Sequence, residues 1–359
     1  MTLPSSSLNS IYGRVKQLIR AGEWWSYKLP LALGVAYALA FRAHLNLISL
    51  WFSLALIVIC GTLLAIFASV FNDFIDQKED KLAGKTTGLM SLSASQQRLV
   101  LTALTICMAS AALLLSRTPL ALLIYLLIWL DYTLYSLPPF RLKVRGIWGI
   151  LSIATGEHVL ASLFAVALLA ESSHCPVSFA WLAALSGWSM AYGCRGILWH
   201  QLCDYENDRL SGTRTLGAVR GPQFLKWLGE RVVFPLELTS LMVFLVLSQN
   251  VLIWPALLVS ALLECSRVFD KSVNLIVVAP AKNFRIAMVE FYQLFFPLAF
   301  LVALVERNPS VIMVVAAQVL LFPWPLWHCL RYSKRALLSG LRRLRYDRKP
   351  LESIAKGTV

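Results

Sequence analysis

The chain has 359 residues, of which 58% are hydrophobic and 14% are charged, and its formal net charge is +14. A mean hydropathy of +0.67 excludes an ordinary soluble domain and indicates an integral membrane protein. The positive charge is confined to loops and tails between apolar segments, so we expect membrane lipids as partners and no nucleic acid. Seven scattered cysteines without a CxxC pair predict neither a disulfide framework nor a zinc site.

Residues 1–27 are basic and rich in serine, without the apolar core and cleavage site of a signal peptide, so we expect a cytoplasmic surface segment. Residues 28–330 are expected to form one transmembrane domain, and residues 331–359 a basic cytoplasmic tail suited to anionic head groups. The fold class we predict is an all-α polytopic bundle. Ten apolar runs are long enough to cross a bilayer as helices, at residues 29–46, 50–71, 98–116, 119–136, 147–169, 178–200, 230–248, 250–266, 286–305 and 309–330. The seventh and eighth runs lie so close together that nine spans remain an alternative to ten.

Lysine and arginine divide unequally between the two sides of this layout. One side receives only Arg42, Arg117 and Arg307, Arg195 lies within a helix, and the other 29 of the 33 accompany both termini. The positive-inside rule makes the richer side cytoplasmic. We therefore expect a protein of the cell inner membrane whose termini, and whose loops after the second, fourth and sixth helices, are cytoplasmic.

Seven of the 19 acidic residues gather in two stretches on this otherwise basic side, NDFIDQKED at residues 72–80 and DYEND at residues 204–208. Asn72, Asp76 and Asp80 are four residues apart, as are Asp204 and Asp208, so each set shares one face of a continuing helix. Like charges at this spacing repel unless they are neutralised. A solvated acidic loop is the ordinary interpretation, whereas Mg²⁺, which binds carboxylates together with substrate phosphates, explains why acids gather here.

The acidic stretches follow the second and sixth helices, which indicates a weak internal repeat of four helices and a pseudo-twofold bundle. The loop after the fourth helix contributes Arg141, Lys143 and Arg145 directly after a Pro-Pro break. Such cations are typical of snorkelling loop residues, and they also suit the oxygens of a diphosphate.

At these residues the sequence resembles the UbiA-type intramembrane prenyltransferase superfamily. The first motif of that family, NDxxDxxxD, is matched by Asn72, Asp73, Asp76 and Asp80. The second, DxxxD followed by Gly and Thr, is matched by Asp204, Asp208, Gly212 and Thr215. The string YSxPPxRxKxxG between them is matched by Tyr135, Ser136, Pro138, Pro139, Arg141, Lys143 and Gly146. The resemblance covers about residues 25 to 305.

The resemblance implies a Mg²⁺-dependent prenyltransferase of about nine spans that acts on a polyprenyl diphosphate donor and a small-molecule acceptor. The implied metal ligands are Asn72, Asp76, Asp204 and Asp208. The implied catalytic aspartates are Asp76 and Asp208, with Asp73 and Asp80 in support. The candidate substrate-binding residues are Arg141, Lys143, Tyr135, Arg209 and His200. Many members also carry an Arg-x-Arg-Pro string after the first motif, which this chain lacks, and Lys85 or Lys81 is the candidate to replace its cation. The C-terminal part contains one predicted helix more than the family norm.

Other functions remain open at this point. A cyclase of the same fold would ionise a prenyl diphosphate without passing it to an acceptor, and a cation-coupled transporter would place its charged site near the bilayer midplane. A CDP-alcohol phosphotransferase would need DG and AR residues upstream of its aspartates, which this sequence lacks.

Ionisable residues within the apolar segments are functional candidates by default, and these are Glu157, His158, Arg195 and His200. An Arg195–Glu157 ion pair that ties helices together and a catalytic role are equally good explanations. Trp188 and Trp199 either line a carbocation cavity through cation–π contacts or belong to interfacial aromatic belts.

Overall fold

The ten predicted apolar segments fall largely on helices in the computed structural model, which describes residues 11–82, 84, 86–269, 274–278 and 284–334. The α-helices are α1 (Ile11–Ile19), α2 (Ala21–Trp24), α3 (Leu29–Arg42), α4 (Trp51–Ile75), α5 (Gln77–Leu82), α6 (Ala94–Leu114), α7 (Pro119–Ser136), α8 (Ile147–Ala154), α9 (Ala161–Ser173), α10 (Phe179–Cys203), α11 (Tyr205–Ser211), α12 (Leu216–Arg220), α13 (Pro222–Leu228), α14 (Phe234–Ser248), α15 (Ile253–Phe269), α16 (Phe296–Arg307) and α17 (Ile312–Leu321). A last helix covers Pro323–Lys334.

Single turns of other helix types connect several of these elements. Short 3₁₀ turns cover Leu89–Ser91, Leu142–Val144 and Pro309–Val311. A π-helical turn joins α8 to α9 (Thr155–Leu160), another joins α13 to α14 (Gly229–Val233), and a third precedes α16 (Phe291–Phe295). Helix starts follow ordinary capping chemistry: Ser93 and Gln96 form a capping box at α6, and Pro119 opens α7 where no N–H partner is needed.

The chain is an integral membrane protein with several apolar helices. Five helices of the described residues are long and apolar enough to cross a bilayer, namely Trp51–Ile75, Ala94–Leu114, Pro119–Ser136, Ile147–Ser173 and Pro222–Ser248. A sixth candidate consists of Pro309–Leu321 and Pro323–Lys334, which meet at an angle of 76°. Proline has no N–H and its ring clashes with the preceding turn, so the predicted tenth helix is broken at Pro323 rather than continuous.

A short sheet interrupts the helices between α15 and α16. Strand β1 (Asn274–Ile276) pairs in parallel with β2 (Phe284–Ile286), with Asn274 opposite Phe284 and Ile276 opposite Ile286. We did not predict this sheet, although Ile276 and Val277 are residue types that favour strands. The ninth predicted segment consequently becomes helical later than expected, because Ile286 ends the strand and residues 287–288 form a turn.

The centre of the bundle is packed with aromatic rings. Trp188 is 1% exposed, and its ring lies 5.2 Å from that of Phe244, 5.3 Å from that of Tyr292 and 5.4 Å from that of Phe296. Trp188 therefore packs the core, and the expectation that it lines a carbocation cavity is wrong. Trp199 is half-buried near the end of α10, with its ring 4.9 Å from the imidazole of His200.

The predicted Arg195–Glu157 ion pair does not form, because Arg195 has a different partner. Its Nε and Nη2 each donate to the Glu237 carboxylate at 2.6 Å, and both side chains are buried. The Tyr292 hydroxyl also donates to Glu237 at 2.7 Å. Glu157 instead pairs with Lys28 Nζ at 2.5 Å. Arg195 thus joins α10 to α14, and Glu157 joins α8–α9 to the start of α3.

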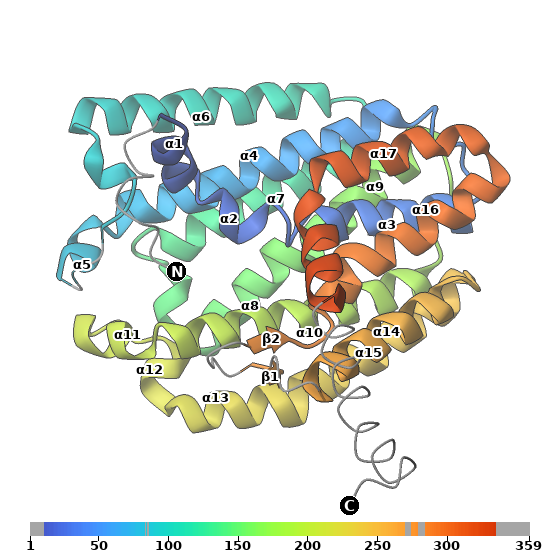
Figure 1. Cartoon of the computed structure of the whole chain (residues 1–359). Coiled ribbons are helices and arrows are strands. Elements are labelled where there is room, and N and C mark those ends of the chain that lie inside the picture. The colour runs from blue at the N-terminus through green and yellow to red at the C-terminus, as the bar shows by residue number, and fades with distance from the viewer. Residues whose placement is uncertain (1–10, 83, 85, 270–273, 279–283, 335–359) are drawn as a thin grey trace, which may run out of the picture.

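Both acidic stretches lie at one end of the bundle, as the positions of α5 and α11 show (Figure 1). Helices α4 and α10 each have 25 residues, and each ends directly before an aspartate, Asp76 and Asp204 respectively. The i→i−4 backbone hydrogen bonds continue through both breaks, to Asp80 and to Asp208. The prediction that each acidic set shares a continuing helix is therefore correct except for a bend at Asp76 in the first set and at Asp204 in the second.

Candidate active site

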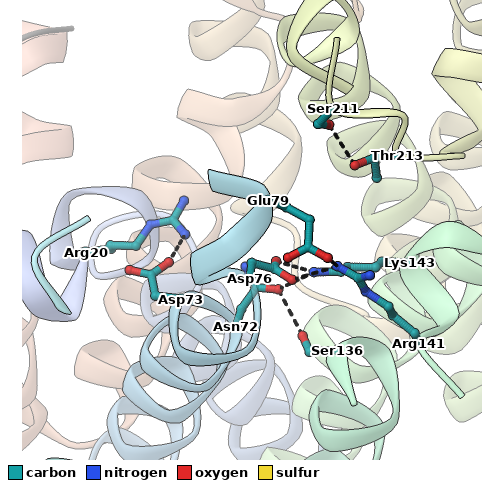
Figure 2. A network of polar contacts seen from close by, with 10 residues as sticks. All are labelled: Arg20, Asn72, Asp73, Asp76, Glu79, Ser136, Arg141, Lys143, Ser211 and Thr213. Atoms are coloured by element: carbon teal, nitrogen blue, oxygen red, sulfur yellow. Dashed lines mark hydrogen bonds and ion pairs between the residues drawn. The ribbon is translucent and has the colours of Figure 1, made fainter. Parts of the chain in front are cut away.

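Asn72 and Asp76 are surrounded by the hydroxyl of the last residue of α7 and by cationic side chains from the loop that follows (Figure 2). Ser136 Oγ donates to Asn72 Oδ1 at 2.9 Å, and Lys143 Nζ donates to the same oxygen at 3.2 Å. Lys143 also contacts Asp76 Oδ2, and Arg141 Nη2 donates to Asp76 Oδ1 at 3.1 Å. The structure therefore brings together the first aspartate-rich motif and the cationic loop, as predicted.

Arg141 also links this cluster to Glu79, whose Oε1 accepts from Nη2 at 2.9 Å. Burial alone would raise the pKa of Glu79, but hydrogen bonds from its own backbone N–H and from Arg141 lower it below its ordinary value. Burial also lowers the pKa of Lys143, although Asp76 opposes that shift. Arg141 and Lys143 thus contact carboxylates at the end of the bundle that carries both acidic stretches, which we call its mouth. Lys143 is held there in a partly desolvated environment.

The second motif is joined to the same loop through Thr215. Thr215 Oγ1 donates to Asp208 Oδ2 at 2.8 Å, and the Thr215 backbone forms a parallel β-bridge with Gly146. Gly146 has φ +60° and ψ −117°, a conformation available in practice only to glycine. The last glycine of the YSxPPxRxKxxG string therefore lets the cationic loop pair with the segment that holds Asp208.

An apolar pocket lies between α3, α4, α7 and α9. Its wall includes the apolar side chains of Ile57, Ala65 and Phe164 together with the Tyr132 ring. The Lys28–Glu157 ion pair contributes the polar part of the wall. A mostly apolar wall with a few placed polar groups is typical of small-molecule sites.

Comparison with known proteins agrees with this arrangement of motifs. The sequence pattern of the UbiA prenyltransferase family matches residues 29–274, which is more than half of the chain. The chain belongs to the UbiA prenyltransferase family. The resemblance inferred from the motifs is thereby confirmed, as is the prediction that the chain is an enzyme of this family. No curated protein sequence matches the chain.

Solved structures with low sequence identity show the same fold. A UbiA homolog from Archaeoglobus fulgidus bound to DMAPP and Mg²⁺ has a TM-score of 0.56 and 16% identity, covering 84% of this chain and 99% of that one. The homolog from the same organism bound to GPP and Mg²⁺ has a TM-score of 0.52 and 14% identity, covering 91% and 99%. The predicted all-α, UbiA-like bundle is therefore confirmed at the level of the fold.

The remaining predicted site residues of this family member differ in their placement. Tyr135 is half-buried on the last turn of α7 beside Ser136, and Asp80 is half-buried on α5. His200 is exposed at the end of α10. Arg209 is also exposed and pairs with Glu206 of its own helix at 3.3 Å. Lys85 lies outside the described residues, and Lys81 is exposed.

Sequence reasoning missed two residues that the structure places at the site. Arg20, from the segment before α2, lies beside Asp73 with its Nη1 3.4 Å from Asp73 Oδ1 (Figure 2). Lys28, at the start of α3, reaches the pocket through its pair with Glu157. Both belong to a basic N-terminal stretch that positive-inside topology explains without any site, so no signal in the sequence separates them from ordinary loop cations.

Proposed function

We propose that this family member transfers a prenyl group from a polyprenyl diphosphate to a small aromatic or lipophilic acceptor within the membrane, in a Mg²⁺-dependent reaction. The observation that carries this proposal is the convergence of the first aspartate-rich motif, the cationic loop and the Asp208 segment at one end of a UbiA-like bundle. The homologs of known structure hold DMAPP or GPP together with Mg²⁺, which is the ligand chemistry such a site requires.

The donor set fits Mg²⁺ in its chemistry. Within the described part of the chain, no three His, Cys, Asp or Glu side chains could hold a metal ion by themselves. Mg²⁺ keeps several waters and takes substrate phosphates, so few protein oxygens suffice, and Asp73 Oδ2 is buried without a hydrogen-bond partner. Asn72, Asp76, Asp204 and Asp208 would hold the ion. Bound Mg²⁺ would neutralise the negative charge that develops on the departing diphosphate.

The cationic loop would bind the diphosphate itself. Arg141 and Lys143 contact Asp76, and Arg141 Nε is buried without a partner. Both cations would turn to the phosphate oxygens, and their charge stabilises the leaving group as the bond between C1 and the bridging oxygen breaks. The acceptor then forms its bond to C1. Asp73 and Asp80 would support the ligands.

Four further residues complete the proposed substrate contacts. We place Tyr135, His200, Arg209 and Lys85 among them, on the family motif and on their positions in the sequence. The structure describes three of these, and they flank the motifs at the ends of α7, α10 and α11.

The apolar pocket between α3, α4, α7 and α9 would hold the prenyl chain. Its apolar wall suits a hydrocarbon tail, and its position between membrane helices gives a lipid-borne donor access. The ring of Tyr132 and the indole of Trp24 also line it, and aromatic faces attract a developing allylic cation.

We further propose nine to ten spans arranged as a pseudo-twofold bundle, within a transmembrane domain of residues 28–330 in the cell inner membrane. The equal lengths of α4 and α10 and their matching breaks at Asp76 and Asp204 support the repeat. The excess of lysine and arginine beside both motifs supports cytoplasmic termini, a cytoplasmic basic segment at residues 1–27 and a cytoplasmic tail at residues 331–359, in contact with membrane lipids.

A product assay tests the function directly. Membranes containing the full chain are incubated with labelled prenyl diphosphates and a panel of acceptors, with Mg²⁺ or with EDTA, and products are identified by mass. We expect prenylated acceptor and free diphosphate only with Mg²⁺. Cyclic hydrocarbons or alcohols formed from the donor alone would instead identify a cyclase, and no release of diphosphate with any donor would refute the proposal.

Narrowing the pocket tests its assignment. Ala65 lies on α4 in the pocket wall, so A65F would shorten the space for the chain. We expect kcat/KM for long donors to fall at least about tenfold relative to the shortest donor, since overpacking excludes additional methylenes. Ile59, exposed on the lipid side of the same helix, provides the control variant I59F. An equal loss for all chain lengths in A65F would place the prenyl chain elsewhere.

A further inference from the structure

Arg20 occupies a restrained position between α1 and α2. Its backbone is left-handed, with φ 51° and ψ 33°, a conformation that is strained for a residue with a Cβ. Its guanidinium contacts Glu23 on one side, with Nη2 2.7 Å from Oε2 and Nε 3.0 Å from Oε1. On the other side, Nη1 lies 3.4 Å from Asp73 Oδ1 (Figure 2). Arg20 therefore projects from an N-terminal turn onto the first aspartate-rich motif.

Two tryptophans hold this turn in place. Trp24 is 3% exposed and its Nε1 donates to the Ile19 carbonyl at 2.9 Å. Trp25 Nε1 donates to the Leu321 carbonyl at 2.8 Å, and its ring lies 5.5 Å from that of Phe322. The turn that carries Arg20 is thus anchored both to the core and to the end of α17.

The chain after the first motif also packs closely on α1. A Cβ at Gly88 would lie 2.7 Å from backbone atoms of Leu18 and 2.9 Å from the Gln17 carbonyl carbon, so only glycine permits this approach. Gly88 belongs to the segment that follows Asp80. Helix α1 and the acidic motif are therefore held in a fixed relation, which pre-organises Arg20 beside Asp73.

The charges around Arg20 come from both motifs. Burial lowers the pKa of Arg20, but the carboxylates of Glu23, Asp73 and Asp204 more than offset this effect and raise it above its ordinary value. Asp73 Oδ1 is contacted by Arg20, whereas its Oδ2 is buried with no hydrogen-bond partner. The pairing of Arg20 with Asp73 therefore leaves the carboxylate incompletely satisfied, as expected of a site that awaits a further ligand.

We propose that Arg20 is a third diphosphate-binding cation, supplied by the N-terminal segment and held by Glu23 and Asp73 until the substrate diphosphate binds. This inference rests on the proposed function of the same site. The Glu23 pair is half-exposed, and ion pairs in contact with solvent contribute little to stability, so Arg20 can exchange Glu23 for another anion at little cost. The planar guanidinium presents two N–H groups to phosphate oxygens, which a lysine cannot reproduce. Because it contacts Asp73, the same cation would compete with Mg²⁺ for the acidic cluster.

Binding measurements on the full chain in detergent test this proposal without catalysis. Calorimetric titrations use MgCl₂ alone, and then inorganic pyrophosphate in saturating MgCl₂, on wild type, R20A, R20K and K16A. We expect R20A to weaken pyrophosphate binding about tenfold or more, as for loss of one charge-assisted bond, and R20K to recover only part of it. Mg²⁺ alone should bind R20A as tightly as wild type or more tightly. K16A removes the same charge from exposed Lys16 of α1 and should stay within about twofold of wild type.

The opposite responses to the two ligands separate a binding role from a structural one. Pyrophosphate affinity in R20A equal to that of wild type would overturn the proposal. A parallel fall in Mg²⁺ affinity, pyrophosphate affinity and thermal midpoint would also overturn it, because Arg20 would then only support the fold. Failure of the proposed function gives a different pattern, in which wild type itself binds no pyrophosphate in the presence of Mg²⁺.

Discussion

Two arginine–carboxylate networks in this protein use the same chemistry for different ends. In the core, Arg195 makes two hydrogen bonds of 2.6 Å to Glu237, with 1% and 0% of the side chains exposed. At the mouth of the bundle, Arg141 divides one nitrogen between Asp76 and Glu79, and the side chains of Arg141 and Asp76 are 25% and 11% exposed. The first network is closed to solvent, and the second is accessible.

The difference extends to the hydrogen-bonding capacity that each network leaves unused. Around Glu237, Tyr292 and Arg195 supply three donors, and Arg195 also donates to the Val277 carbonyl at 3.2 Å. Near Asp76, by contrast, Arg141 Nε and Asp73 Oδ2 are buried without partners. A saturated buried pair ties helices together, whereas an unsaturated accessible cluster can accept a ligand. Charge within a membrane protein is therefore not evidence of function until its partners are known.

The largest effect should come from removing a carboxylate of the mouth cluster. We expect D76A or D208A to lower kcat by roughly 10³-fold or more, as when a principal transition-state contact is lost, while the protein stays folded in detergent. Release of labelled diphosphate from the donor measures kcat, and the thermal midpoint reports the fold. E306A, which removes an exposed carboxylate at the end of α16, should leave both unchanged. Retained turnover in D76A or D208A would remove these residues from the metal site.

Substitutions in the core network of Arg195 and Glu237 should lower the stability of the protein and leave its catalytic activity unchanged. R195M leaves the Glu237 carboxylate buried without its cation, which costs about 3–5 kcal/mol and should lower the thermal midpoint. The double variant R195M/E237Q restores neutrality and keeps an acceptor for Tyr292, so most of the lost stability should return. Activity per folded molecule should stay near that of wild type in both variants. A large loss of kcat in R195M/E237Q at normal stability would instead place Arg195 in the reaction.

Hydropathy and motif spacing predicted most of the fold and the centre of the site. Each predicted apolar run falls largely on a helix, because a bilayer requires a long apolar segment whatever its neighbours are. The three motifs lie at the ends of α4, α7 and α10, and the cationic loop lies beside the first acidic stretch, where Lys143 and Arg141 contact Asn72 and Asp76. These features depend on local sequence and on the order of helices, both of which can be read directly.

Which charged side chains pair with each other could not be predicted in the same way. Glu157 pairs with Lys28 and Arg195 with Glu237, because rotation of each helix about its axis and packing against its neighbours decide which charges meet. Arg20 and Asp73 are 53 residues apart and meet through side chains alone. The bend at Pro323, by contrast, could have been predicted, since a proline within an apolar run indicates a helix break. Our prediction of a continuous helix relied on hydropathy alone.

The smallest expected effect concerns Lys143, which contacts Asp76 and Asn72 at the mouth. A hydrogen bond to a charged group contributes about 1.5–3 kcal/mol, so K143A should lower kcat/KM for the donor roughly 10–100-fold. A loss mainly in KM would mean that Lys143 binds diphosphate equally in the ground and transition states, whereas a loss in kcat would mean that its charge acts on the leaving group. R98A, which removes an exposed cation at the start of α6, controls for the change in net charge. Unchanged kinetics in K143A would mean that Lys143 is only a positive-inside loop residue. The network at the mouth would then resemble the Arg195–Glu237 pair of the core in having a structural role alone.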